Sequence, residues 1–549
     1  MLVYAVYDGD QPAASFLLQQ AHLIGANEIG VQGDVTFREG MIICDKRTAE
    51  SASLVLLIDA GEHGRLMLPT CLLPDREEPY LLYIELARHR IKLFLVKLED
   101  WMLFELADDH PIMRQWANAR ELFTQALCLE KNEPDKAQNL ARQSLIEAIA
   151  AGEKLTFMHT DMLLGKRFNN GNGPPPTLGC RVYQSQFAEP LAEIVARDFD
   201  YISVPIRWRE LEPEEGAYDW KKFDRWIEWA GKAKFPVMLG PIIDFRQLSV
   251  PEWLYIWEHD YDTLYDLLHE HIEAIVNRYR SSVSIWNIAS SLHINESFTL
   301  AYDQLMDLTR MATGLVKSLH PAGRTLVEVT EPFGEYFAGH PRSVPPIVYA
   351  EMIAQSGFKL DLVGMNIQVG HHSRGQATRD FMQISSILDT LLFLDFPVIV
   401  TGIGAPSHRP LRGETKAPAT EEADAKPQAG EGEAGKSEAP PAVPVAEAPD
   451  AAGHYRDPWT PVRQAEWLRK ALSIALSKPF VESAVCHELF DHQSAELPGG
   501  GLISSMGRPK PALTAVSDLH RDLRRRTLRC TTPEEREWVT NHDTAALED

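Results

Sequence analysis

The residues best suited to chemistry in this sequence are polar side chains at or just beyond the ends of predicted strands. Glu331 and Glu488 each follow such a strand, and two carboxyl groups in different environments can divide the roles of general acid and of base or nucleophile. His371 and His372, taken with Glu331, contain no metal-ligand spacing such as H-E-x-x-H. The sequence therefore contains a candidate carboxylate pair and predicts neither a metal nor a cofactor.

The elements that would position these side chains alternate between strand and helix from residue 178 onward. Apolar runs typical of strands buried on both faces are separated by amphipathic stretches such as Tyr265–Tyr279 and Leu300–Leu319. Eight such units predict a closed (β/α)8 TIM barrel, with a doubly wound open sheet as the alternative. The predicted strands are Leu178–Tyr183, Tyr201–Ile206, Pro236–Ile243, Val283–Ala289, Leu326–Thr330, Leu362–Ile367, Pro397–Ile403 and Phe480–Cys486.

The whole chain is expected to be an α/β protein of several regions, because 549 residues exceed one ordinary core. Residues 1–111 have a β-rich pattern typical of a sandwich or jelly roll, and residues 112–165 predict a helical linker. The barrel would span 166–525, interrupted at 413–452 by an acidic Ala/Pro/Glu insertion that is expected to be disordered, either inert or a partial cover over the pocket. Residues 526–549 are expected to form a loosely packed tail.

Two local predictions concern the region before the barrel. Leu54–Ile58, Leu66–Leu68 and Tyr80–Ile84 are predicted strands, since each is a short apolar run bounded by turn residues. The linker is predicted to contain two helices separated by a polar turn near Asn132–Asp135.

Composition excludes several classes of partner. The formal net charge of −24 argues against a nucleic-acid surface, which needs clustered Lys and Arg. No apolar run approaches the roughly 18 residues of a membrane span, and the first residues lack the pattern of a secretory signal. The six cysteines include no C-x-x-C pair. We therefore expect a cytoplasmic protein, while its oligomeric state stays open.

Four motifs in the predicted barrel resemble segments of the family-10 glycoside hydrolases, whose members include endo-1,4-β-xylanases. The segment after the second strand resembles the family's Lys–Trp, Glu-Pro, Gly, aromatic and Asp pattern, and VPEW resembles its third-strand exit. The helix before the fourth strand and the closing RPKPA also resemble family segments, so the resemblance covers about residues 178 to 525. The matching residues are Arg207, Trp208, Glu212, Pro213, Gly216, Tyr218, Asp224, Val250–Trp253, Arg278–Tyr279, Trp286 and Arg508–Ala512.

The same resemblance implies that both catalytic carboxylates are missing. Ser291 stands where the family has its acid/base Glu at the end of the fourth strand, and a hydroxyl is far too weak an acid to replace it. Gly402 stands at the position of the nucleophilic Glu on the seventh strand and has no side chain with which to form a glycosyl-enzyme. Glu331 and Glu488 are the substitutes that we consider for a relocated pair.

Three functional hypotheses follow. The first is a carbohydrate-binding, catalytically inactive or altered family-10-like protein with an oligo- or polysaccharide ligand. The second is an active glycosidase that uses a relocated carboxylate pair at the end of the barrel, and the third is a non-catalytic scaffold. Under the first hypothesis, the residues expected to contact a ligand are Arg207, Trp208, Asp244, Trp253, Asn287, Gln368 and Asp491.

Overall fold

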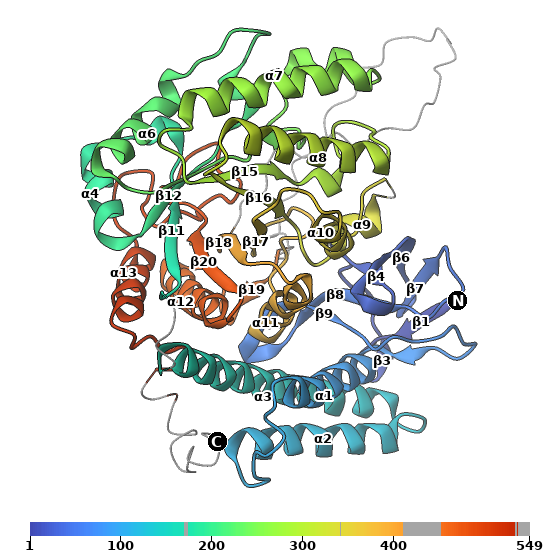
Figure 1. Cartoon of the computed structure of the whole chain (residues 1–549). Helices are drawn as coiled ribbons and strands as arrows, with labels where there is room; N and C mark the ends of the chain where they lie inside the picture. Colours follow the sequence, from blue (N-terminus) through green and yellow to red (C-terminus); the bar gives the residue numbers. More distant parts are fainter. Residues whose placement is uncertain (170–173, 341, 410–451, 533–534, 536–549) are drawn as a thin grey trace, which may run out of the picture.

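A closed barrel of eight parallel strands dominates the computed structural model, which describes residues 1–169, 174–340, 342–409, 452–532 and 535 (Figure 1). The strand order is β13-β12-β11-β20-β18-β17-β16-β15, and pairing between β13 and β15 closes the ring. This closure confirms the (β/α)8 prediction and rules out the open sheet. The barrel strands are β11 (Thr177–Arg181), β12 (Tyr201–Val204), β13 (Val237–Leu239), β15 (Ile285–Ser290), β16 (Arg324–Val329), β17 (Leu362–Gln368), β18 (Val398–Gly404) and β20 (Val481–Cys486).

Each of the eight predicted strands overlaps an observed one. The third is shorter than predicted, because Pro241 lacks a backbone N–H and interrupts the pairing before the short β14 (Ile243–Asp244). Inward-facing apolar side chains close the end of the barrel at which the strands begin, and the opposite end, here called the barrel mouth, is polar. The apolar layer consists of Tyr201, Met238, Leu326, Leu362, Ile399 and Val485.

Amphipathic helices surround the barrel because each strand must return to the same edge of the sheet. Their apolar faces join the outward-facing strand residues in one large core. The helices of this part are α4 (Glu189–Asp198), α5 (Trp208–Leu211), α6 (Lys221–Ala233), α7 (Tyr261–Tyr279), α8 (Tyr302–Leu319), α9 (Glu335–Gly339), α10 (Pro346–Gln355), α11 (Phe381–Thr390), α12 (Pro461–Ser477) and α13 (Pro511–Arg524).

The region before the barrel contains the expected β-sheets together with a helix that was not expected. One sheet has the order β10-β1-β7-β6 and the other β19-β9-β8-β4-β5, and both contribute side chains to one core. The prediction of a strand at Tyr80–Ile84 was wrong beyond its first two residues, because helix α1 (Leu82–Asp100) begins there and buries Leu82, Ile84 and Leu86. The strands are β1 (Leu2–Ala5), β2 (Tyr7–Asp8), β3 (Gln11–Pro12), β4 (His22–Ile24), β5 (Gly30–Val31), β6 (Gly33–Arg38), β7 (Met41–Lys46), β8 (Ser53–Asp59), β9 (Gly64–Pro69), β10 (Tyr80–Leu81) and β19 (His454–Tyr455).

Two long helices join the sheets to the barrel. Helix α2 (Pro111–Leu129) and helix α3 (Pro134–Asn169) are separated at the predicted polar turn. Helix α3 packs along α1 and α2 and also contacts α11 and α12 of the barrel (Figure 1). The helical pair therefore contacts both parts of the chain.

Strand β19 ties the barrel directly to the N-terminal sheets. It pairs antiparallel with β9, with His454 opposite Arg65, although it lies between the seventh and eighth barrel strands in sequence. On the same side of the barrel, Arg90 of α1 forms a buried ion pair with Asp380 at 3.0 Å. The N-terminal sheets are thus anchored to the barrel by backbone pairing as well as by side chains.

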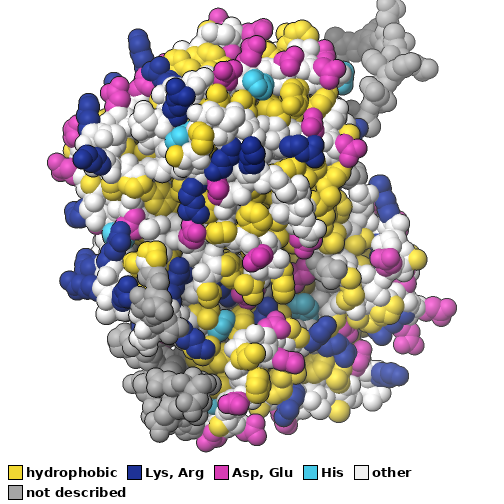
Figure 2. Space-filling view, in the orientation of Figure 1, with side chains coloured by type: hydrophobic (Ala, Val, Ile, Leu, Met, Phe, Trp, Pro, Cys, Tyr) yellow, Lys and Arg dark blue, Asp and Glu magenta, His cyan; other side chains and the backbone are white. Residues whose placement is uncertain are grey.

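The predicted disordered insertion at 413–452 lies outside the described residues except for its last residue, and most of the tail beyond residue 532 lies outside them as well. Among the helices of the described ranges, none combines the length and the apolar character that a bilayer crossing requires. On the face drawn in Figure 2, acidic and basic side chains are interspersed over the surface.

Candidate functional site at the barrel mouth

Ser291 directly follows strand β15, and its side chain is hydrogen-bonded within the protein. Its Oγ lies 2.8 Å from Thr330 Oγ1 and 3.1 Å from Ser290 Oγ, and the residue is 2% exposed. Its backbone is left-handed (φ 59°), an unusual conformation for a residue with a side chain. The position that the motifs predict for the family's acid/base therefore holds a buried hydroxyl in a hydrogen-bonded chain.

Gly402 on β18 leaves room for Asn366 of the neighbouring strand β17. A Cβ at position 402 would lie 3.0 Å from both the Nδ2 and the Oδ1 atoms of Asn366, closer than most real contacts. The Asn366 amide thus occupies space that a larger side chain at position 402 would need. A carboxylate at 402 would require Asn366 to move.

A carboxylate that the sequence analysis missed lies inside the barrel beside Ser291. Glu328 on β16 accepts hydrogen bonds from Asn287 Nδ2 at 3.0 Å and from Ser290 Oγ at 2.8 Å, and it is 5% exposed. An acidic residue inside the apolar run of β16 could have signalled an inward-facing polar position. Predicted ligand residue Asn287 is thus bonded to an internal carboxylate, with its Oδ1 buried and unpartnered.

A second missed carboxylate, Glu496, lies at the centre of an ionic network over the mouth. Its Oε1 lies 3.2 Å from Arg246 and 3.4 Å from Arg181, and Arg246 also pairs with Asp244 at 2.7 Å. Burial alone would raise the pKa of Glu496, but Arg246 and Arg181 hold it well below its ordinary value. Glu496 therefore stays ionised and cannot serve as a proton donor.

The loop after β20 brings Glu496 to this place. Arg207 holds the loop by donating from Nη2 to the Ser494 carbonyl at 2.9 Å. Asp491 accepts from Lys510 at 2.6 Å, and Lys510 also donates to Ser407 Oγ at 3.0 Å. Predicted ligand residues Arg207 and Asp491 thus position loops, and Lys510 of the RPKPA motif joins the loops that follow the last two strands.

The two predicted aromatic contacts pack within the protein. Trp208 is 3% exposed, its ring stacks on His271 at 4.1 Å between centroids, and its Nε1 donates to Glu212 at 2.7 Å. Trp253 meets Trp208 edge-on and donates to the Glu212 backbone carbonyl at 3.0 Å. Trp208 thus uses its ring in the core, and the half-buried Trp253 supports it.

The two predicted substitute carboxylates have different surroundings. Glu331 follows β16, and burial raises its pKa to about 8, with Glu335 adding to the effect and Arg246 opposing it. Glu488 follows β20 and is paired with His492 at 3.3 Å. Within the described part of the chain, no hydrogen bond joins Glu331 to Glu488. Glu331 thus has the character of a protonated acid near neutral pH, whereas Glu488 has a histidine partner.

Several polar atoms in the barrel interior are buried without a hydrogen-bond partner. Gln368 donates from Nε2 towards Asn366 Oδ1 at 3.2 Å and lies 3.1 Å from His487 Nδ1, while its Oε1 is unpartnered. Thr401 Oγ1 and His487 Nε2 are unpartnered as well. Over the described ranges, no group of three or more His, Cys, Asp or Glu side chains is arranged to hold a metal ion. The interior thus contains buried polar groups with unused hydrogen-bonding capacity.

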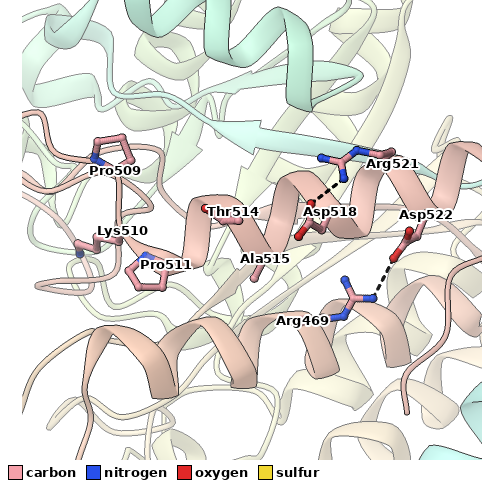
Figure 3. Close-up of a pocket in the computed structure, with 9 residues that line it drawn as sticks. All are labelled: Arg469, Pro509, Lys510, Pro511, Thr514, Ala515, Asp518, Arg521 and Asp522. Atoms are coloured by element: carbon pink, nitrogen blue, oxygen red, sulfur yellow. Dashed lines mark hydrogen bonds and ion pairs between the residues drawn. The ribbon is translucent and has the colours of Figure 1, made fainter. Parts of the chain in front are cut away.

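A second groove, of about 930 Å³, lies between α12 and α13, with Lys510 at one end (Figure 3). Its charged side chains are paired across and along these helices, Arg469 with Asp522 at 3.0 Å and Arg521 with Asp518 at 2.9 Å. Because these charges already pair with one another, they are poorly suited to bind a charged ligand.

Comparison with known proteins agrees with the motifs. Residues 172–308 match the model of glycosyl hydrolase family 10. Over 105 residues the chain is 26% identical to endo-1,4-β-xylanase B of Thermotoga neapolitana, and over 179 residues it is 21% identical to endo-1,4-β-xylanase C of Paenibacillus barcinonensis. These matches cover 19% and 31% of this chain, and only 30% and 13% of those curated relatives.

Similar solved structures are also xylanases. Native xylanase 10B of Thermotoga maritima aligns over 67% of this chain and 99% of its own length, with 14% identity and a TM-score of 0.44. Xylanase 10B of Thermotoga petrophila, solved with xylobiose, aligns over 65% and 96%, with 14% identity and a TM-score of 0.43. The match of residues 172–308 to the family model confirms the resemblance to family 10 that the motifs indicate.

Proposed function

We propose that this divergent family-10 relative has lost xylan hydrolysis and binds a short saccharide through hydrogen bonds at its barrel mouth. The observation that carries the proposal is the pair of replacements at the two catalytic positions. Ser291 offers a hydroxyl that is bonded to Thr330, and Gly402 faces the Asn366 amide. Retaining hydrolysis needs one carboxyl as acid and a second as nucleophile, so these positions cannot support it.

Glu496 and Glu328, the two carboxylates beside Gln368 and Ser290, are not suited to replace the lost pair. Glu496 is held ionised by Arg181 and Arg246, and Glu328 accepts two hydrogen bonds from neighbouring side chains. By contrast, the amide of Gln368 and the hydroxyl of Thr401 retain unused hydrogen-bonding capacity. Uncharged groups of this kind suit the hydroxyls of a sugar. Relatives solved with xylobiose and with xylopentaose support the choice of saccharide.

The proposal is tested by measuring binding and hydrolysis separately. Titration calorimetry with xylobiose and xylopentaose should give a binding signal, while release of reducing sugar from xylan should stay at background. Thr401→Val keeps the shape of the side chain but removes the unused hydroxyl, so it should weaken binding about fivefold. Thr313→Val in α8, a buried threonine away from the mouth, serves as the matched control.

Two results would refute the proposal. Release of reducing sugar by the purified protein would disprove the loss of hydrolysis. Absence of binding to either oligosaccharide would disprove saccharide binding and leave a scaffold role for the barrel.

A second candidate is a glycosidase with a relocated acid, and the raised pKa of Glu331 favours it. A carboxyl with a pKa of about 8 is protonated at neutral pH, as a general acid must be. In that case a panel of aryl glycosides should reveal turnover that Glu331→Gln abolishes. Unchanged turnover in Glu331→Gln would exclude Glu331 as the acid.

A further inference from the structure

A cavity of about 110 Å³ lies where the N-terminal sheets meet the barrel. Its walls come from β4, from Glu28–Gly30 at the start of β5, from β8 and the end of β9, from α1, from the loop after β16, and from α10 and α11. Most of this lining is apolar, including Val55, Leu93, Phe333, Ile347 and Ile387. The cavity is separate from the barrel mouth and uses none of the residues assigned to it above.

His22 of β4 presents a hydrogen-bond acceptor to this cavity. The residue is 7% exposed, and its Nδ1 lies 2.9 Å from the Gln20 carbonyl oxygen, which can only accept. Nδ1 must therefore carry the ring proton, and burial lowers the pKa of His22 to about 3, so the ring is neutral. The remaining Nε2 is an unprotonated acceptor, buried and without a partner.

Arg379 presents a donor to the same cavity. It is 3% exposed; Nη1 donates to the Met67 carbonyl at 3.2 Å, and Nη2 donates to Glu335. The guanidinium lies 4.6 Å from the ring centre of Phe333. Its Nε–H is buried without a partner, whereas its charge is already balanced by Glu335. The cavity therefore offers a donor without a free positive charge.

A third polar group completes the set. Ser386 of α11 lines the cavity, and its Oγ is buried and unpartnered. Glu28, His89, Gln383 and Thr390 also line the cavity, but the lining atoms that are buried without a hydrogen-bond partner are one acceptor, one donor and one hydroxyl. A hydroxyl group matches this combination, because it can donate to His22 Nε2 and accept from Arg379 Nε–H.

We propose that this interdomain cavity is a binding site for a small, uncharged, largely apolar molecule that carries a hydroxyl group, such as a phenol or an aromatic alcohol. At about 110 Å³ the cavity is smaller than the apolar cavity of about 150 Å³ that holds benzene, so its occupant must be small, with one ring at most. Ions are disfavoured, because Arg379 is already paired and a charge would lose its hydration among apolar walls. A ligand here would contact both the N-terminal sheets and the barrel.

Phenol is the probe for the test, and toluene, of similar shape without a hydroxyl, is its control. In titration calorimetry on the full-length protein, phenol should bind at least five times more tightly than toluene, the ratio that about one net hydrogen bond provides. His22→Leu should reduce this preference to near unity. His259→Leu, at a histidine whose side chain is 87% exposed, is the matched control and should leave the preference unchanged.

A second variant distinguishes loss of the cavity from loss of folding. Leu93→Phe keeps His22 and Arg379 but fills the cavity, so it should abolish phenol binding while the thermal unfolding transition is retained. Three outcomes would overturn the proposal. In the first, phenol binds the Leu93→Phe variant as well as the parent protein, and in the second it binds the parent no more tightly than toluene does. The third outcome is no phenol binding at all, with only water in the cavity.

Discussion

Glu331 should make the stability of the protein fall as pH rises from about 4.5 to 8. Burial raises its pKa from 4.5 to about 8, and Glu335 and Glu296 add to this effect, whereas Arg246 and Arg374 oppose it. Below pH 4.5 the carboxyl is neutral in both the folded and the unfolded chain. Between the two pKa values only the unfolded chain releases the proton, so the folded state loses stability, and above pH 8 the loss is complete.

The size of the effect follows from the shift. A rise of this extent corresponds to at most about 5 kcal/mol, and the partial exposure of Glu331 to solvent reduces the expected loss to roughly 2–3 kcal/mol. Glu331→Gln is neutral at every pH and should lack this loss. Urea denaturation at pH 5, 7 and 9 should therefore show that the free energy of unfolding of the variant increases relative to that of the parent protein as pH rises.

The control is Glu193→Gln, at an exposed carboxylate on α4, which should follow the parent protein at each pH. Parallel stability profiles for Glu331→Gln and the parent protein between pH 5 and 9 would refute the reasoning. They would show that Glu331 ionises in the folded protein as readily as in the unfolded chain.

Three further predictions concern stability, and each is measured by urea denaturation. Glu496→Gln should lower the free energy of unfolding by about 3 kcal/mol, because it removes the buried carboxylate that Arg181 and Arg246 share and leaves only Arg246 with another carboxylate, Asp244. Glu482→Gln, in an exposed pair, should lower it by less than about 1 kcal/mol, and equal losses would contradict the role of burial. Gly402→Ala should lower the free energy of unfolding by about 1–3 kcal/mol, because the added methyl group crowds Asn366. In the double variant, Asn366→Ala should restore part of this loss, and losses that simply add would exclude the clash. Lys478→Met should lower the free energy of unfolding by about 2 kcal/mol, because Lys478 is 1% exposed and donates to Ser385 and Asp389. An unchanged free energy of unfolding would show that this buried amine does not stabilise the fold.

The barrel strands were predictable because both of their faces are buried. Runs such as Leu362–Ile367 and Pro397–Ile403 stay apolar over several residues, and the structure places a strand within a residue or two of each. The helix α1 was missed because Tyr80–Ile84 has the same apolar appearance as a strand. Its helical character lies in the following residues, where buried and exposed positions alternate with helical spacing.

The site was less predictable than the fold, because residue type does not reveal what a side chain contacts. Trp208 has the character of a sugar platform in sequence, yet its ring stacks on His271 of α7. Glu496 lies in a loop after the last strand, and only the folded loop brings it to Arg181 and Arg246. Ser291 could be placed from the motif at the end of β15, since that motif is local to one strand.

The pairing of β19 with β9 has a consequence for the order of folding during synthesis. His454 and Arg65 are about 390 residues apart in sequence. At about 5–20 residues per second, the ribosome needs roughly 20–80 s to make the intervening chain. Throughout that time the outer edge of β9 lacks its β19 partner and is open to pairing with another chain. The N-terminal sheets therefore reach their final form only after seven of the eight barrel strands have been synthesised, and the two parts of the protein mature together.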